Sequence, residues 1–180
     1  MNVPLRRALA AVSLLLAGAC AGSPPARETA SVPADANARL DTLIARLVTV
    51  HHALDAKGYA QLYTDSAVFE WPAFDTVRGR AGIEAMARGN FAPLDDLVIR
   101  ITPSARRLAA DHATEFGAFE ETWNDSTGAR KAEYGRYAET LARQPDGSYL
   151  IDHFLGFEDS TATLSPARAD SAHAARPASR

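Results

Sequence analysis

The chain has 180 residues, of which 47% are hydrophobic and 23% charged, a balance typical of a globular protein rather than a disordered or fibrous one. This length suits one domain with a hydrophobic core and is short for two. The formal net charge of -3 offers no basic excess to neutralise a phosphate backbone, which argues against nucleic acid as a partner.

Residues 1–20 have the layout of a secretory signal. Arg6 and Arg7 precede an apolar stretch that is short for a membrane-spanning helix, which needs about 20 apolar residues. Small residues then lead to Cys20, the only cysteine, as in a bacterial lipobox. This pattern predicts a lipid anchor at Cys20; the alternative is a plain cleaved signal peptide that happens to contain a cysteine. Because Ala21 follows, and not the aspartate of an inner-membrane retention signal, we expect a periplasm-facing anchor in the outer rather than the inner membrane.

Two segments rich in Ala, Pro and Ser flank the remainder of the chain. Residues 21–37 and 160–180 carry few bulky apolar side chains, so they cannot bury enough surface to offset the entropy of ordering. We expect a disordered tether, a folded domain over residues 38–159 and a disordered tail.

The first part of the domain is predicted to be helical. Apolar positions recur at three- and four-residue steps and form one stripe: Leu40, Leu43, Ile44, Leu47, Val48, His51 and Leu54. A break near Gly58 leads to a short helical turn over residues 59–65. A strand over residues 67–71 stops at Pro72, and a third helix is expected over residues 79–91.

Four long strands follow, over residues 97–110, 113–123, 130–144 and 148–158. The joints read "DH", "NDSTG" and "PDG", which are turn sequences typical of consecutive antiparallel hairpins. The sequence therefore predicts an α+β domain in which a curved, mostly antiparallel sheet folds over about three helices.

Several stretches resemble a known family in order and spacing. The most specific are "LYTDSAVF", "RGRAGI" and "DGSYLI", which are similar to the SnoaL-like branch of the nuclear-transport-factor-2-like superfamily. The resemblance marks Asp65, Gly79 and Gly147 as fold positions. It implies a cone-shaped domain with a deep, mostly apolar cavity. Members act as isomerases, cyclases, dehydratases or hydrolases, bind ligands, or associate with proteins, and many form homodimers through the open face of the sheet, so a homodimer is expected.

One departure from the family bears on mechanism. Ketosteroid-isomerase-like members place their general base, an aspartate, directly before the proline that ends the first strand. Here that position is Trp71, before Pro72, and an indole cannot abstract a proton. Glu70 is next to it but points to the opposite face of the strand.

Three residues are candidates for acid/base catalysis. His51 lies in the apolar stripe of the first helix, where it either faces the cavity or sits at a half-exposed edge and hydrogen-bonds a backbone carbonyl. Glu115 shares a strand face with Phe119, Glu121 and Trp123, and is either buried there or exposed on the sheet. By alternation, His153 shares a face with Tyr149 and Ile151. If the three converge, they form a site without metal.

The sequence predicts a ligand pocket and no cofactor. The predicted aromatic and polar wall consists of Tyr63, Phe69, Trp71, Phe119, Tyr137 and His153. No HExxH, CxxC, GxSxG or phosphate-binding glycine loop occurs, so we expect neither a metal nor a nucleotide. Three functions stay open: binding of a small apolar or amphipathic molecule, a cofactor-independent isomerase, dehydratase or hydrolase in the same cavity, or a protein-interaction module.

Overall fold

The computed structural model describes residues 31–164, which contain three helices and six strands. The helices are α1 (Ala36–His52), α2 (Ala56–Ala60) and α3 (Gly79–Phe91). The strands are β1 (Tyr63–Trp71), β2 (Phe74–Arg78), β3 (Asp95–Leu108), β4 (His112–Asn124), β5 (Arg130–Arg143) and β6 (Tyr149–Thr163). Cys20 and the predicted signal lie outside the described residues. Within them, no helix is long and apolar enough to cross a membrane.

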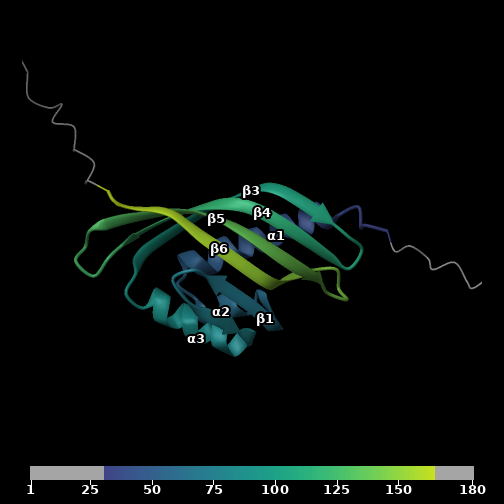
Figure 1. Cartoon of the computed structure of the whole chain (residues 1–180), viewed down its shortest axis with the longest axis horizontal. Helices are drawn as coiled ribbons and strands as arrows, with labels where there is room; N and C mark the ends of the chain where they lie inside the picture. The colour runs from purple at the N-terminus through teal and green to yellow at the C-terminus, as the bar shows by residue number, and fades with distance from the viewer. Residues whose placement is uncertain (1–30, 165–180) are drawn as a thin grey trace, which may run out of the picture.

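All six strands belong to one sheet in the order β2-β1-β6-β5-β4-β3 (Figure 1). The four long strands β3 to β6 form the predicted antiparallel meander, because each turn sequence joins sheet neighbours. Strand β1 pairs in parallel with β6, which places the N-terminal strand beside the last one. The α+β fold with a strongly curved sheet is therefore confirmed.

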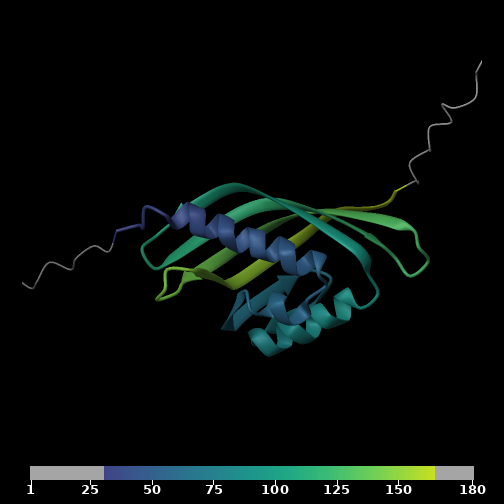
Figure 2. The same ribbon diagram turned by 180° about the vertical axis from the view of Figure 1, so that it is seen from behind.

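The helices cover the concave face of the sheet. Helix α1 runs along the long strands, and α2 and α3 lie beyond its C-terminal end, next to β1 (Figure 2). The stripe predicted for α1 faces the core: Leu40, Leu43 and Leu47 are buried, and so is His51. This apolar face against the sheet stabilises the helix through tertiary packing rather than through intrinsic propensity.

The family's marker positions have local structural roles. Gly79 (φ 73°) begins α3 and Gly147 (φ 83°) lies in the last hairpin, both in the left-handed region that favours glycine. Arg80 donates two hydrogen bonds to the carbonyl oxygen of Tyr63 and pairs with Asp65 at 2.8 Å. These contacts fasten the start of α3 to the start of β1.

Several elements differ from the prediction. Helix α1 begins at Ala36, within the predicted tether of residues 21–37, and the second helix spans Ala56–Ala60 where residues 59–65 were expected. Strand β2 was not predicted, because its sequence lies in a short stretch between Pro72 and the glycines of the third helix. Strand β1 begins at Tyr63, where a helical turn was expected. Strand β6 continues to Thr163, beyond the predicted strand end at residue 158 and the predicted domain end at residue 159, because residues 160–163 pair with β5 as far as Lys131. Pairing with a long neighbour orders residues that the composition assigned to a disordered tail.

Candidate functional site

A cavity of about 420 Å³ lies between the concave face of the sheet and the three helices. Its walls come from every helix and every strand, so the site exists only in the folded domain. Phe69, Trp71, Phe119 and Tyr137, all predicted as wall residues, line it. So do His51 and Glu115.

One side of the cavity is an aromatic wall. Phe69 and Trp71 of β1 lie on the same face of the strand, with Phe154 of β6 stacked on Phe69 at a centroid distance of 4.9 Å. Trp71 also packs at 5.9 Å from Phe119 of β4 and stacks with Phe74 of β2. Several parallel rings offer a flat, apolar surface to a ligand. Trp71, which occupies the position of the aspartate in ketosteroid-isomerase-like members, is thus part of this wall.

Glycines in the sheet allow three of the rings to lie close to the backbone. A Cβ atom added at any of these glycines would overlap ring atoms of the facing side chain. The pairs are Gly117 with Tyr137, Gly135 with Phe119, and Gly156 with Trp71. Small residues on the concave face therefore keep room for the cavity, a feature that the sequence pattern alone did not reveal.

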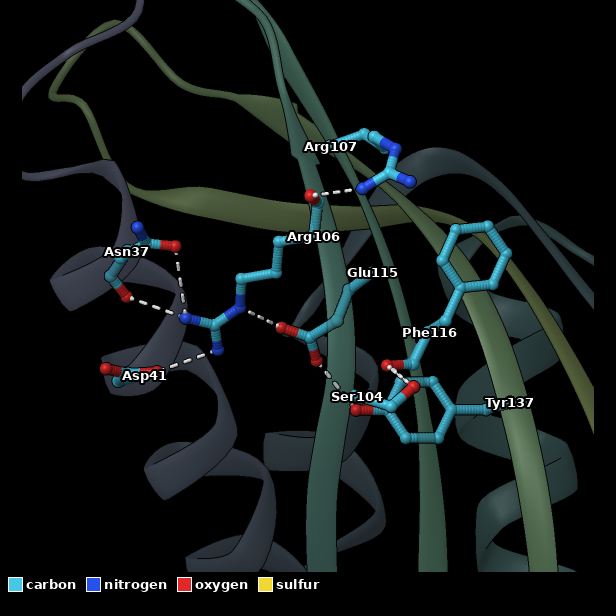
Figure 3. A network of polar contacts seen from close by, with 8 residues as sticks. All are labelled: Asn37, Asp41, Ser104, Arg106, Arg107, Glu115, Phe116 and Tyr137. Atoms are coloured by element: carbon cyan, nitrogen blue, oxygen red, sulfur yellow. Dashed lines mark hydrogen bonds and ion pairs between the residues drawn. The ribbon is translucent and has the colours of Figure 1, made fainter.

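Glu115 forms a buried polar network at one end of the cavity (Figure 3). It is 1% exposed, and it accepts a hydrogen bond from Arg106 Nε at 2.6 Å and one from the Tyr137 hydroxyl at 2.7 Å. Arg106 also pairs with Asp41 of α1 at 2.7 Å. Burial and the bond to Glu115 raise the pKa of the Tyr137 hydroxyl, which keeps it protonated. Both Glu115 oxygens already accept a hydrogen bond within the protein, so this carboxylate joins neighbouring strands and is not a free base.

Glu139 of β5 faces Glu115 directly across the strand pair. Its side chain lines the cavity and is 6% exposed. Among residues 31–164, no group makes a hydrogen bond or ion pair with it. Burial, reinforced by the negative charge of Glu115, raises the pKa of Glu139 to about 8.

His51 and Glu121 meet at another part of the cavity. The His51 Nδ1 atom lies 2.8 Å from the Leu47 carbonyl oxygen, which can only accept, so Nδ1 carries the proton. Burial lowers the pKa of His51 to about 4, and the ring is therefore neutral at neutral pH with a free lone pair on Nε2. That atom is 3.8 Å from Glu121 Oε1. Burial, and then the nearby Glu133, raise the pKa of Glu121 to about 7.

Aromatic side chains fix the orientation of His51. Tyr59 and Phe91 contact its ring edge-on, with centroids at 5.0 and 5.6 Å. Both alternatives considered for His51 thus hold in part: it bonds a backbone carbonyl, and it also faces the cavity. His51 and Glu115 both line the cavity, but each is engaged by a different partner.

Two predicted wall residues do not line the cavity. Tyr63 is fully buried behind Tyr59, and the two hydroxyls are hydrogen-bonded. The face predicted for His153 is wrong: its ring points to the outer face, where Nε2 contacts Glu70 at 2.9 Å. The cause is a bulge in β6. Thr140 pairs with His153 but Leu141 with Ile151, so the extra residue Asp152 reverses the alternation and turns Phe154 inward.

Sequence reasoning missed the acidic character of the cavity. Glu121, Glu133 and Glu139 line it together with Glu115. Glu121 had been placed on the correct face, and counting in twos from Tyr137 would have found both Glu133 and Glu139. No sequence signal pointed to Arg106 as the partner of Glu115.

Comparison with known proteins agrees with this fold. The SnoaL-like domain model matches residues 34–154, so the chain belongs to the SnoaL-like domain family. No curated protein matches the sequence. Three similar solved structures illustrate the range of the fold.

A Mycobacterium tuberculosis protein of unknown function is 24% identical, with a TM-score of 0.61 over 68% of this chain and 76% of that one. A nuclear-transport-factor-2-like protein with a cystatin-like fold from Novosphingobium aromaticivorans is 20% identical (TM-score 0.60; 70% and 83%). The hexachlorocyclohexane dehydrochlorinase LinA-type3 from Novosphingobium barchaimii is 15% identical (TM-score 0.63; 72% and 90%). At these identities the likeness shows a shared fold.

Proposed function

We propose that the domain binds a small, mostly apolar molecule in the cavity between sheet and helices. The observation that carries this proposal is the cavity itself. At about 420 Å³ it falls within the range of roughly 300–1,000 Å³ that is usual for ligand pockets, and a wall of stacked rings lines it. An interaction module whose own side chains fill the cone would lack such a space.

Native mass spectrometry of the chain purified from the envelope of its native host tests this proposal. We expect a reproducible extra mass that is lost in Trp71→Ala, which removes the central ring of the wall. The matched control is Phe116→Ala, which removes an aromatic ring from the outer face of β4 and should retain the ligand. A protein that carries no ligand in any preparation would contradict the proposal.

A second candidate function is proton-transfer catalysis without a cofactor, and the His51–Glu121 pair favours it. The carboxyl group of Glu121, with a pKa near neutrality, can take up and return a proton, and the free Nε2 lone pair of the neutral His51 beside it can relay that proton. The relative LinA-type3 is by name a dehydrochlorinase, so the same fold is compatible with chemistry on a small apolar substrate.

Deuterium exchange distinguishes catalysis from binding. The bound molecule, once identified, would be incubated with the protein in D₂O and its C–H signals followed by NMR. A catalyst would exchange protons or convert the molecule, and His51→Gln would abolish this while binding persists. His112→Gln, at the exposed start of β4, is the matched control. An unchanged molecule would leave binding as the function.

We further propose that a lipid at Cys20 anchors the chain to the bacterial envelope, facing the periplasm. The support is the lipobox-like sequence before this single cysteine. Labelling cells with an alkyne fatty acid should tag the protein but not Cys20→Ser. Outer-membrane fractionation would then test the expected location, and an untagged, freely secreted protein would contradict it.

The outer face of the sheet supports a homodimer, which we also propose. Phe116, Tyr134 and Phe157 are exposed there, on strands whose outer face no described helix covers. Light scattering after size exclusion should report a dimer, and Phe157→Glu should yield monomers. A monomer at micromolar concentration would contradict this.

A further inference from the structure

The cavity wall is mostly apolar, but it contains several carboxyl groups. Its lining includes four glutamates and, among the described residues, neither lysine nor arginine. Of these four glutamates Arg106 pairs only with Glu115, and Glu121 has only the neutral His51 beside it, which leaves Glu121, Glu133 and Glu139 without a lysine or arginine partner. The lining therefore contains carboxyl groups whose ionised form no lysine or arginine of the described residues neutralises.

The register of the sheet makes these carboxyl groups costly. Glu115 lies directly opposite Glu139, and Glu121 directly opposite Glu133, across the β4–β5 pair. Like charges in directly opposed positions destabilise a sheet. Stability alone thus gives no reason for two such pairs on the face that lines the cavity.

Glu139 is the clearest sign of a missing partner. Its side chain is more than nine-tenths buried, lines the cavity, and has no hydrogen bond or ion pair with any residue of the part described. Buried carboxyl groups are normally hydrogen-bonded or paired, because leaving them without a partner carries a large desolvation cost. A ligand that brings a positive group or several N–H donors would satisfy it.

The rest of the wall suits the same kind of ligand. Trp71, Trp123 and Tyr59 line the cavity together with the carboxyl groups. Aromatic faces attract ammonium groups through their quadrupole, and they pack against apolar bodies. Acidic groups among aromatic rings form a site that selects positive charge on an apolar molecule.

We propose that the cavity binds an organic cation, an amine or substituted ammonium on an aromatic or alkyl body, with its charge at Glu139. This inference rests on the proposed function, that the cavity holds a small molecule. It adds the class of ligand: cationic amphiphiles are preferred over neutral or anionic molecules of the same shape.

Three probes of equal length test it: phenylbutylamine, phenylbutanol and phenylbutyrate, titrated into the full chain at neutral pH by calorimetry. We expect the amine to bind at least roughly tenfold more tightly than the alcohol, and the carboxylate most weakly. Glu139→Gln should remove most of this preference while the alcohol binds as before, and Glu121→Gln, six residues farther along the strand pair, should reduce it by less. Glu120→Gln is the matched control, since it removes the same charge from the outer face of β4.

The outcomes separate the two proposals. If the alcohol or the carboxylate binds as tightly as the amine, the charge inference is overturned and the small-molecule cavity stands. If none of the probes binds, both the proposed function and this inference are overturned. Should Glu139→Gln fail to fold, the ratio of the amine's affinity to the alcohol's affinity, measured in the unchanged protein and in Glu121→Gln, still decides whether the cavity prefers a cation.

Discussion

Replacing Glu139 by Gln tests the electrostatics of the cavity through folding stability. Glutamine has nearly the same shape as a protonated glutamate, so the change removes only the ability to ionise. The titratable groups that face this side chain are the Glu115 carboxylate of β4, Arg106 of β3, and the hydroxyls of Tyr59, Tyr63 and Tyr137. Burial and Glu115 outweigh Arg106, which is why the pKa of Glu139 rises.

The sign and size of the effect follow from proton linkage. The pKa of Glu139 is raised from 4.5 to about 8, so between these values the native state holds a proton that the unfolded state has lost. Stability from this group is complete below pH 4.5 and is lost as the pH rises towards 8. The shift in the pKa of Glu139 sets an upper bound of about 5 kcal/mol on the unfolding free energy that is lost as the pH rises. Relaxation of the site should leave a loss of roughly 3–5 kcal/mol. The Glu139→Gln variant should not lose this stability, because glutamine does not ionise.

Urea denaturation at roughly pH 5, 7 and 9 measures the difference. The two proteins should be nearly equal at the lowest pH, and the variant more stable at the highest. His51, whose pKa is lowered to about 4, makes both proteins more stable as the pH rises from 4 to 6.5, and it cancels in the comparison. Glu120→Gln should follow the unchanged protein at every pH. A stability difference that does not vary with pH would refute the reasoning.

Three further changes test the packing around the site. Arg106→Met leaves Glu115 buried without its cation and should lower the free energy of unfolding by about 3 kcal/mol, as measured in urea, with partial recovery when Glu115→Gln is added. Gly156→Ala pushes a methyl group into the Trp71 ring and should destabilise by about 1–3 kcal/mol in the same assay. Gly89→Ala, in helix α3 with open space around the glycine, should instead stabilise by roughly 0.5–1 kcal/mol in thermal melts.

These changes carry their own controls. Arg136→Met breaks an exposed pair with Asp159 and should change stability little, since solvent screens surface ion pairs. An equal loss in both arginine variants would show that burial of Glu115 is unimportant. Gly89→Ala adds the same methyl group at a helix position where no atom beyond its chain neighbours and the helix backbone lies within 4 Å, so a loss of similar size in both variants would contradict the argument from ring contact.

The sequence by itself determined the fold class and most of the elements. The three- and four-residue repeat of Leu40, Leu43 and Leu47 specified the first helix, and turn sequences separated the four long strands. These signals are local, and the physics behind them acts over a few residues. The same alternation placed Glu115, Phe119 and Trp123 on one face of β4, which the structure shows to be the cavity face.

Only the tertiary structure decided what the cavity contains. Alternation failed at His153, because pairing between β5 and β6 takes up one extra residue, and register depends on the partner strand. The Glu115–Arg106 contact joins two adjacent strands, and Glu139 acquires its raised pKa only when the helices close over the sheet and exclude water. Burial and charge at this site arise from segments that are distant along the chain, so no pattern within one segment encodes them.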